Sequence, residues 1–315
     1  MAIRSVRAVL LVALSLGLAG CASAPANPEA FSFAVMGDIP YRPSEEASYR
    51  AMLQRLDGEP VAFVIHVGDI ISGAGACTDA IYARRKAEFD ASSHPFIYTP
   101  GDNEWTDCRR AKHDPIERLA RLRQVFFSDR FSLGATRIEM SVQDRCADPE
   151  CRCAAQPENR FWSRAGVRFV TLNIPGSENN VGYDAANDAE AECRNQANAK
   201  WLEQAVRASE RSETRALVIA LQADPWATRK PVYKAFLQQV VDAARQLRKP
   251  VLFVHGDSHT LTIDTPFKDA LGNTILNITR LETYGSPFVG YVRVTVDPGN
   301  PELFSFRPVL QALAP

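Results

Sequence analysis

The sequence has almost no net charge. Its 36 lysine and arginine residues nearly balance 37 aspartate and glutamate residues, which leaves a formal charge of -1 at pH 7. This balance gives no electrostatic basis for nucleic-acid binding, so we expect no nucleic-acid partner. The sequence also lacks internal repeats and low-complexity blocks. With 315 residues, 46% of them hydrophobic and 23% charged, the chain can bury a full core, and we predict one large globular domain.

A long hydrophobic run is absent too. The N-terminal apolar stretch from Ala8 to Leu18 is too short to span a bilayer comfortably. Arg4 and Arg7 precede it, and small residues lead into Cys21 in the order Leu-Ala-Gly-Cys. This arrangement resembles a bacterial lipoprotein signal. The alternative is an ordinary secretory signal with a chance cysteine.

The lipoprotein interpretation divides the chain into three parts. Residues 1–20 are the signal peptide, residues 21–30 are a flexible tether of small residues and prolines, and residues 31–315 are the folded domain. Cleavage would leave Cys21 as the lipidated N-terminus. We therefore expect an extracytoplasmic protein, lipid-anchored to the bacterial envelope and on its periplasmic face if the cell is Gram-negative, that contacts the membrane only through this anchor.

Cysteines with the usual zinc-site spacing are missing, because no C-x-x-C motif occurs. Without Cys21 six cysteines remain, and an even number in an oxidising compartment favours disulfides. We expect Cys77 to pair with Cys108, since each follows one of the acid-containing loops described below. The others would staple an insertion near residues 141–160, and they are Cys146, Cys151, Cys153 and Cys193. The alternative for Cys151 and Cys153 is a zinc knot, although C-x-C lacks the usual reach.

Strand-like and helix-like segments alternate along most of the chain. Short apolar runs predict buried strands, whereas runs with apolar residues three and four positions apart predict helices. The predicted strands cover residues 31–37, 61–67, 96–99, 161–177 (two strands), 216–221 and 251–254, and the predicted helices cover 44–56, 79–90, 114–126, 185–209 and 232–247. Only strands follow, near residues 261, 275–280, 291–296 and 303–306. The pattern predicts an α/β fold.

Five of the apolar runs end in a turn that contains an acid. The residues in these turns are Asp38, Asp69, Asp102, Gln222 with Asp224, and Asp257 with His259. Gly-Asp after a strand is a common structural turn, so any single one has an ordinary explanation. The carboxyl ends of strands in an α/β sheet meet at one edge, however, and carboxylates gathered there are neutralised most directly by a metal ion. We therefore predict a metal site.

The order and spacing of these turns resemble the calcineurin-like metallophosphoesterase superfamily over about residues 31–306. The resemblance implies a four-layer α/β/β/α sandwich, two divalent metal ions, and hydrolysis of phosphate monoesters or diesters by a metal-activated water. Asp38 matches the acid of the first motif and Asp69 the acid that bridges both metals. Glu104 matches the acid that closes the third motif, and His259 matches the last histidine.

Five positions depart from the family pattern. Pro40, Asn103 and Gln222 stand where the family places histidines, Asp102 replaces a ligand asparagine, and Asp257 replaces a histidine of the second metal. The motifs "GDNEWTDC" and "HGDSH" resemble an uncharacterised branch of the superfamily with these replacements. The predicted ligands are Asp38, Asp69, Asp102, Gln222, Asp257 and His259. Because this set is rich in carboxylate oxygen, it favours Mn²⁺, Mg²⁺ or Ca²⁺ over Zn²⁺, and iron is also compatible.

Catalytic roles are expected for three residues. Asn103 can orient the phosphate but cannot donate a proton, Glu104 closes its motif, and His255 is a candidate proton donor, although a buried structural histidine is the alternative for His255. Arg109 and Arg280 are candidate phosphate-binding residues.

Two functions fit this sequence. The first is a metal-dependent phosphoesterase that acts on an extracytoplasmic small-molecule phosphate ester. The alternative is a catalytically degenerate envelope lipoprotein that binds metal or a phosphorylated ligand.

Overall fold

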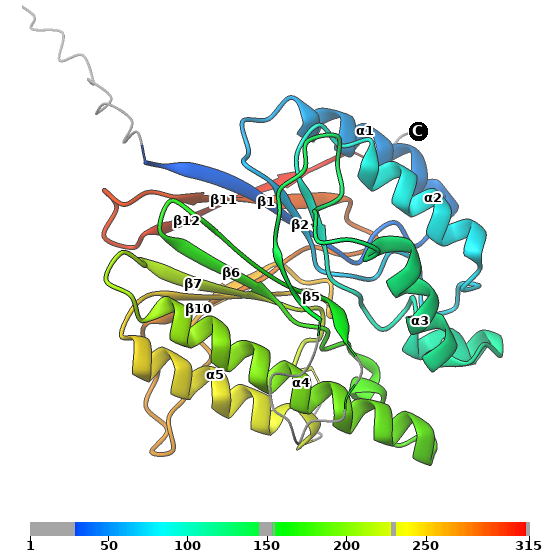
Figure 1. Cartoon of the computed structure of the whole chain (residues 1–315). Coiled ribbons are helices and arrows are strands. Elements are labelled where there is room, and N and C mark those ends of the chain that lie inside the picture. The colour runs from blue at the N-terminus through cyan, green and yellow to red at the C-terminus, as the bar shows by residue number, and fades with distance from the viewer. Residues whose placement is uncertain (1–28, 145–152, 154, 228–230, 313–315) are drawn as a thin grey trace, which may run out of the picture.

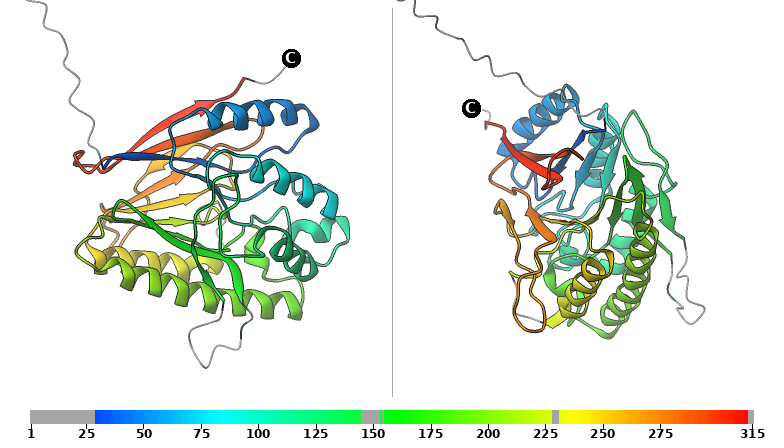
Figure 2. Two further views of the ribbon diagram at one scale, coloured as in Figure 1. Left: turned by 45° about the horizontal axis from the view of Figure 1, so that its top comes forward. Right: turned by 90° about the vertical axis from the view of Figure 1, so that its left-hand side faces the viewer.

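The computed structural model describes residues 29–144, 153, 155–227 and 231–312. Two β-sheets pack face to face, and helices cover the outer face of each sheet (Figure 1). The layers are seen from two further directions in Figure 2. This four-layer α/β/β/α sandwich confirms the fold class expected from the sequence.

The first sheet has five strands in the order β12-β11-β1-β2-β3. Strands β1, β2 and β3 are parallel, and β11 and β12 continue the sheet antiparallel beyond β1. The strand bounds are Phe31–Met36 for β1, Val64–His66 for β2, Phe96–Tyr98 for β3, Gly290–Val296 for β11 and Phe304–Leu310 for β12.

The second sheet has seven strands in the order β4-β5-β6-β7-β8-β10-β9. Its central strands β6, β7, β8 and β10 are parallel. The bounds are Ser141–Gln143 for β4, Gln156–Arg164 for β5, Val167–Thr171 for β6, Ala216–Ala220 for β7, Val251–His255 for β8, Thr262–Asp264 for β9 and Ile278–Glu282 for β10.

Side chains that alternate along β1 supply two different cores. Phe33 and Val35 point between the sheets, where they pack with Phe169 of β6 and other apolar residues of both sheets. Ala34 and Met36 point the other way, toward the helices. This period of two explains why β1 is apolar at nearly every position: both of its faces are covered.

Five α-helices cover the sheets. Helices α1, α2 and α3 pack on the first sheet, whereas α4 and α5 pack on the second. Their bounds are Glu46–Asp57, Asp79–Asp90, Pro115–Phe126, Ala185–Ser209 and Lys234–Leu247. The expected start of α3 is confirmed, because the Asp114 side chain accepts a hydrogen bond from the Ile116 backbone and Pro115 is the first helical residue.

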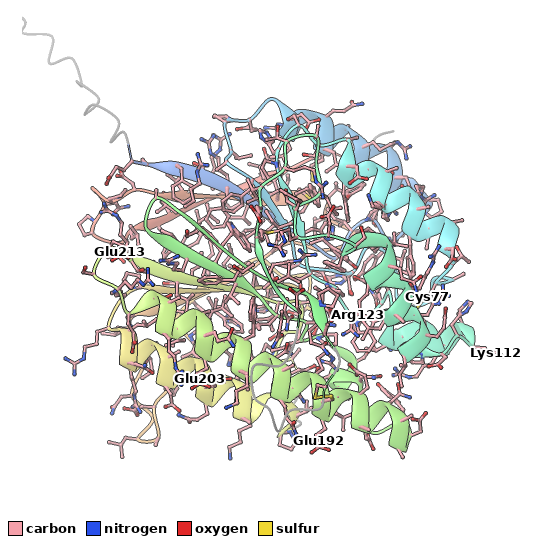
Figure 3. The ribbon with its side chains drawn as sticks, viewed as in Figure 1. Cys77, Lys112, Arg123, Glu192, Glu203 and Glu213 are labelled. Carbon is pink, nitrogen blue, oxygen red and sulfur yellow. A yellow bond between two sulfur atoms is a disulfide. The ribbon has the colours of Figure 1, made fainter. Side chains whose placement is uncertain are left out.

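A buried ion pair joins the two halves of the sandwich. Arg123 of α3 donates to Glu158 of β5 at 2.7 Å, and Glu158 is fully buried. Arg123 is partly buried, with its side chain 21% exposed, and Lys112 lies at the edge of the view in Figure 3. Removing Arg123 alone would leave a buried carboxylate unpaired, which is costly.

Several sequence predictions fall outside the described residues: the signal peptide, Cys21 with most of the tether, Cys146 and Cys151. Within the segment near residues 141–160, β4 and the start of β5 pair at the edge of the second sheet. Cys153 bonds Cys193 of α4. Among the described helices, none combines the length and apolarity needed to cross a membrane.

Candidate metal centre

Four aspartates come together at the carboxyl edge of both sheets. Asp38, Asp69 and Asp102 follow β1, β2 and β3 of the first sheet and are at most 6% exposed, and Asp257 follows β8 of the second sheet. The backbone N–H of Asp257 donates to Asp38 Oδ1 at 3.0 Å, which joins the two sheets at this edge. The convergence expected from the sequence is thus present for all four.

Glycines let these carboxylates approach neighbouring backbone. A Cβ placed on Gly101 would lie 2.0 Å from Asp69 Oδ1, and one on Gly256 would lie 2.1 Å from Asp38 Oδ2. Both distances are far below a normal contact, so only glycine fits at these two positions. The absence of a side chain at these glycines therefore leaves room for the carboxylates of Asp69 and Asp38.

The backbone is strained at the same place. Asp38, Asp69, Asp257 and His259 have φ angles of 57°, 59°, 81° and 62°. Left-handed backbone costs energy in residues with a side chain and concentrates at functional sites. Each strained residue follows the end of a strand, so the strain turns its side chain into the shared edge.

Burial and mutual repulsion raise the pKa values of these carboxyl groups. The pKa of Asp38 lies well above its ordinary value because of burial and then the charge of Asp257. Burial and then the charge of Asp102 do the same to the pKa of Asp69, and raise the pKa of Asp257 to about 7. The cluster is therefore short of positive charge, which a cation would supply.

His259 is oriented as a metal ligand would be. Its Nδ1 lies 2.7 Å from the Ser286 carbonyl oxygen, which can only accept, so Nδ1 carries the proton. The lone pair is then on Nε2, which lies 3.9 Å from Asp38 Oδ1. A backbone carbonyl that fixes the tautomer in this way is typical of histidine ligands.

Gln222 lies beside the cluster with both ends of its amide engaged. Its Nε2 donates to Asp102 Oδ1 at 3.1 Å, and its Oε1 accepts from the Gly176 backbone at 2.6 Å. The structure places Gln222 beside Asp102, and its expected role as a metal ligand stays a prediction.

Glu104 has a different position from the one its predicted catalytic role requires. It is fully buried, and its Oε1 accepts from the backbone of Gly101 at 2.7 Å, the backbone of Asp69 at 3.1 Å and the hydroxyl of Tyr98 at 2.6 Å. We therefore correct its role: Glu104 supports the two loops from behind and does not face a substrate.

His255 is also corrected. It is fully buried against the rings of Trp226 and Phe253, and its Nδ1 donates to the Gly256 carbonyl oxygen at 2.8 Å. Burial lowers its pKa to about 4, so the ring is neutral at pH 7 and holds no acidic proton. This is the structural histidine that the sequence left as the alternative.

The two predicted phosphate-binding arginines differ in position. Arg280 donates to both carboxylate oxygens of Asp264 at 2.7 and 2.6 Å and stacks on Trp226, so we remove it from the site. Arg109 lies nearer, 3.5 Å from Asp107, with its guanidinium over the ring of Tyr183 at 3.3 Å.

Three site residues were not expected from the sequence: Tyr41, Asp107 and Ser177. The Tyr41 hydroxyl donates to Asp69 at 2.6 Å. The Ser177 hydroxyl lies 2.6 Å from Asp102 and 2.8 Å from Asp107. The positions of Tyr41 and Ser177 in the chain could have indicated a site. Tyr41 lies in the same loop as Asp38, and Ser177 lies in the loop after β6, just as the aspartates lie in the loops after their strands.

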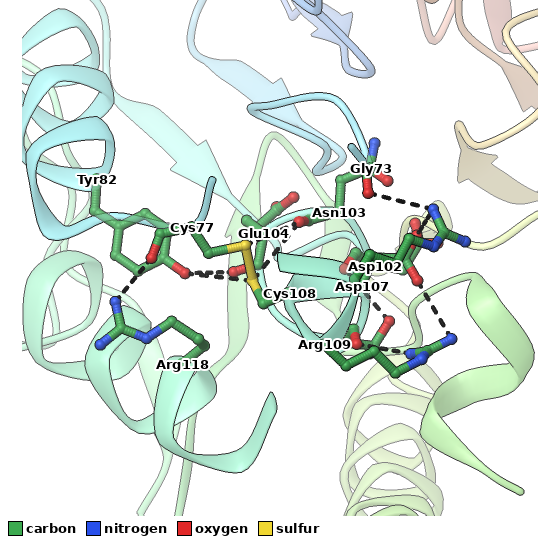
Figure 4. Close-up of a disulfide and its surroundings, with 12 residues drawn as sticks. Gly73, Cys77, Tyr82, Asp102, Asn103, Glu104, Asp107, Cys108, Arg109 and Arg118 are labelled. Atoms are coloured by element: carbon green, nitrogen blue, oxygen red, sulfur yellow. Dashed lines mark hydrogen bonds and ion pairs between the residues drawn. A yellow bond between two sulfur atoms is a disulfide. The ribbon is translucent and has the colours of Figure 1, made fainter. Parts of the chain in front are cut away.

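The expected disulfide between Cys77 and Cys108 is present. It joins the loop after Asp69 to the turn after Asn103, and lies beside Asn103 and Glu104 (Figure 4). Arg118 of α3 donates to the Cys77 carbonyl oxygen at 2.9 Å on the other side. The bond thus fastens two loops of the cluster to the helical layer.

Replacing Cys77 and Cys108 together with alanine is expected to lower the free energy of unfolding by about 2–4 kcal/mol. It should also weaken metal binding, because the loops of Asp69 and Asn103 lose their link. Urea unfolding and calorimetric titration with Mn²⁺ measure the two effects. The matched control is the Cys153 and Cys193 pair, whose replacement should reduce stability only. Equal metal affinity in both variants would contradict the bracing role.

The residues of the cluster fit divalent cations by chemistry. Asp38 Oδ2 is buried and has no hydrogen-bond partner among the described residues, and the donor set is oxygen-rich with one histidine nitrogen. Within the described ranges, however, no three histidine, cysteine, aspartate or glutamate side chains already converge as metal ligands. Hydrogen bonds from Tyr41, Ser177 and Gln222 hold the carboxylates instead. Loading the site would therefore require some of the carboxylate side chains to turn.

Comparison with known proteins supports the fold of this chain and does not establish an activity. No family model matches the chain, and no curated protein matches it. A dimetal phosphatase from Danio rerio aligns over 90% of this chain and 99% of its own, with a TM-score of 0.55 and 14% identity. GAP50, the anchor in the inner membrane complex of Plasmodium, aligns over 90% and 89% with a TM-score of 0.49 and 9% identity. TT1561 of Thermus thermophilus aligns over 88% and 98% with a TM-score of 0.46 and 9% identity. The chain therefore shares the fold of the Danio rerio phosphatase.

Proposed function

We propose that this protein is a metal-dependent phosphoesterase of the calcineurin-like type. The observation that carries the proposal is the gathering of Asp38, Asp69, Asp102 and Asp257 with His259 at one edge of a sandwich that has a dimetal phosphatase fold. Four clustered carboxylates repel one another when they are ionised, and two divalent ions would neutralise that charge.

Asp69 would hold both ions in this proposal. Its two carboxylate oxygens face different partners, the Asn103 backbone at 3.1 Å and the Tyr41 hydroxyl at 2.6 Å. Besides burial, the charges of Asp102 and Asp38 both raise the pKa of Asp69, so both carboxylates lie near it. Asp38 and His259 would complete one side, and Asp102 and Asp257 the other. When bound, such ions lower the pKa of water to supply a nucleophile and stabilise charge on the phosphoryl oxygens.

The protein's own side chains would bind and orient the ester. Asn103 offers a side-chain N–H donor at the cluster, and Arg110 lies close by, paired to Asp107 at 2.5 Å with its side chain 54% exposed. Neither group releases a proton readily, because an amide is not an acid and a guanidinium stays charged. The site therefore suits esters whose leaving oxygen needs no protonation, such as aryl esters or phosphoanhydrides.

Export and anchoring are a separate proposal that rests on the N-terminal sequence. Lipidation at Cys21 would hold the enzyme on the outer side of the cell membrane, where it meets extracytoplasmic phosphate esters. A Cys21→Ser variant should then leave the membrane fraction and appear in the soluble extract. Membrane attachment unchanged in that variant would contradict the anchor.

Hydrolysis of a chromogenic phosphate monoester and diester, with and without added Mn²⁺, tests the proposed function. The expected result is turnover that disappears after chelation and returns with metal. Bound metal without turnover would instead identify a degenerate binding protein, because Asn103 supplies no proton.

A further inference from the structure

We propose that Tyr41 is a positioning residue that fixes the side-chain amide of Asn103 so that its NH₂ group, rather than its oxygen, faces the metal centre. In this orientation Asn103 can donate a hydrogen bond to a phosphoryl oxygen. The inference rests on the proposed function and assigns a role to a residue three positions after Asp38.

A chain of two hydrogen bonds determines the orientation. The Tyr41 hydroxyl donates to Asp69 Oδ2 at 2.6 Å, and Asn103 Nδ2 lies 2.7 Å from the same hydroxyl oxygen. A phenol has one hydrogen, and the Tyr41 hydroxyl directs it to Asp69 Oδ2. Because the hydroxyl donates its one hydrogen to Asp69, its oxygen can only accept from Asn103, so the amide presents its nitrogen.

The other end of the amide agrees with this assignment. Asn103 Oδ1 points toward Gly73, where a Cβ would lie 2.5 Å from that oxygen and 2.6 Å from Arg110 Nη1. A Cβ there would also lie 3.0 Å from Asp107 Oδ2, which pairs with Arg110 at 2.5 Å, so the amide oxygen lies on the side of this ion pair. A reversed amide would turn its oxygen toward the Tyr41 and Asp69 oxygens, which is unfavourable because the Tyr41 hydrogen is already donated to Asp69.

Tyr41 is itself held by the same loop cluster. Its backbone N–H donates to Glu45 Oε2 at 2.8 Å, and Glu45 Oε1 accepts from the Ser286 hydroxyl at 2.7 Å. The edge of its ring meets His259 with 5.1 Å between ring centroids. The hydroxyl therefore has a fixed position before any ligand arrives, as a support for a binding group requires.

The Tyr41 hydroxyl determines which atom of the Asn103 amide a bound phosphate would contact. Without it, the cluster side no longer requires the Asn103 nitrogen, and a carbonyl oxygen turned inward would repel phosphoryl oxygens. The backbone N–H of Asn103, which donates to Asp69 Oδ1 at 3.1 Å, stays in place in either case. The expected loss is thus specific to the side-chain donor.

A double-mutant cycle with Tyr41→Phe and Asn103→Ala tests the inference. The readout is the affinity of the full chain for inorganic phosphate at saturating Mn²⁺, measured by calorimetry. Each single variant is expected to weaken phosphate binding roughly 10-fold or more, as loss of a hydrogen bond to a charged group does. The double variant should bind phosphate no more weakly than Asn103→Ala alone. The control is Tyr49→Phe, which removes a buried hydroxyl without a partner among the described residues and should change nothing.

Mn²⁺ affinity is measured in the same four proteins. Tyr41→Phe should weaken it roughly 10-fold through Asp69, whether or not Asn103 is present. Independent, multiplying losses of phosphate affinity in the cycle would overturn the inference, because a merely structural Tyr41 acts without Asn103. A wild-type protein that binds Mn²⁺ but no phosphate would overturn the proposed function, and the orienting role with it.

Discussion

Asp69→Asn is expected to lose bound metal and phosphoesterase turnover together, while the protein stays folded. Asp69 lies between the other carboxylates, and burial with their charges raises its pKa well above its ordinary value. Replacing a direct ligand of both ions should cost more affinity than the roughly 10–100-fold loss seen when a residue that supports a ligand is removed. Metal content after dialysis, Mn²⁺ titration and ester hydrolysis measure the effect.

Asparagine is the appropriate replacement because of the backbone. The φ angle of 59° at Asp69 is tolerated by asparagine but strains alanine. Asparagine also keeps an oxygen that can accept from Tyr41 or from the Asn103 backbone. The matched control is Asp242→Asn on the exposed face of α5, which should retain full metal content. Wild-type metal content in Asp69→Asn would show that the cluster has been assigned wrongly.

The metal-free protein is expected to lose stability as pH rises from about 4 to about 7. The folded state keeps protons on the clustered carboxyls, with the pKa of Asp257 raised to about 7 and those of Asp38 and Asp69 raised as well. In the unfolded chain the same groups titrate near the ordinary value of about 3.9. Within this window the folded state binds more protons, so its stability is greatest below the unfolded pKa and falls toward the folded pKa.

Each retained proton corresponds to about 1.4 kcal/mol per pH unit in this window. Urea unfolding in the presence of a chelator, between about pH 4.5 and pH 8, measures the slope. Asp257→Asn should reduce the slope by about one proton, and Mn²⁺ at pH 7 should restore the lost stability because cations replace the protons. Stability that rises with pH across the same window would contradict the carboxylate cluster.

The sequence predicted the fold well because its signals are local. Apolar runs such as residues 31–37 and 251–254 became β1 and β8, and the proline-start signal at Asp114 and Pro115 became the start of α3. The acids after β1, β2, β3 and β8 converged because parallel strands share one carboxyl edge. Sheet edges were less predictable: β4 is three residues long and lay within an expected insertion.

Side-chain roles were predicted less well than positions. Glu104 and His255 lie where the motifs place them, but the Glu104 carboxylate accepts hydrogen bonds from Tyr98, Gly101 and the distant Asp69 backbone, and His255 packs against the ring of Trp226. Arg280 instead forms an ion pair with Asp264, which lies opposite it on the neighbouring strand. Such pairings depend on tertiary packing, which no local pattern records.

Tyr41 is the converse case, a residue of the site that the sequence did not predict. Its nearness to Asp38 was the one indication in the sequence, because a tyrosine in a loop is common and its partners Asp69 and Asn103 lie 28 and 62 positions away. Only the folded arrangement reveals that it connects the first three loops.

The most direct test of the account is an anomalous difference map from crystals of the full chain grown or soaked with Mn²⁺. The account predicts up to two peaks at the carboxyl edge, one of them at bonding distance from Asp69 and Asp38 and the other from Asp69 and Asp102 or Asp257. A map without peaks at these aspartates, in crystals that carry Mn²⁺ elsewhere or not at all, would contradict the metal centre and the enzyme built on it.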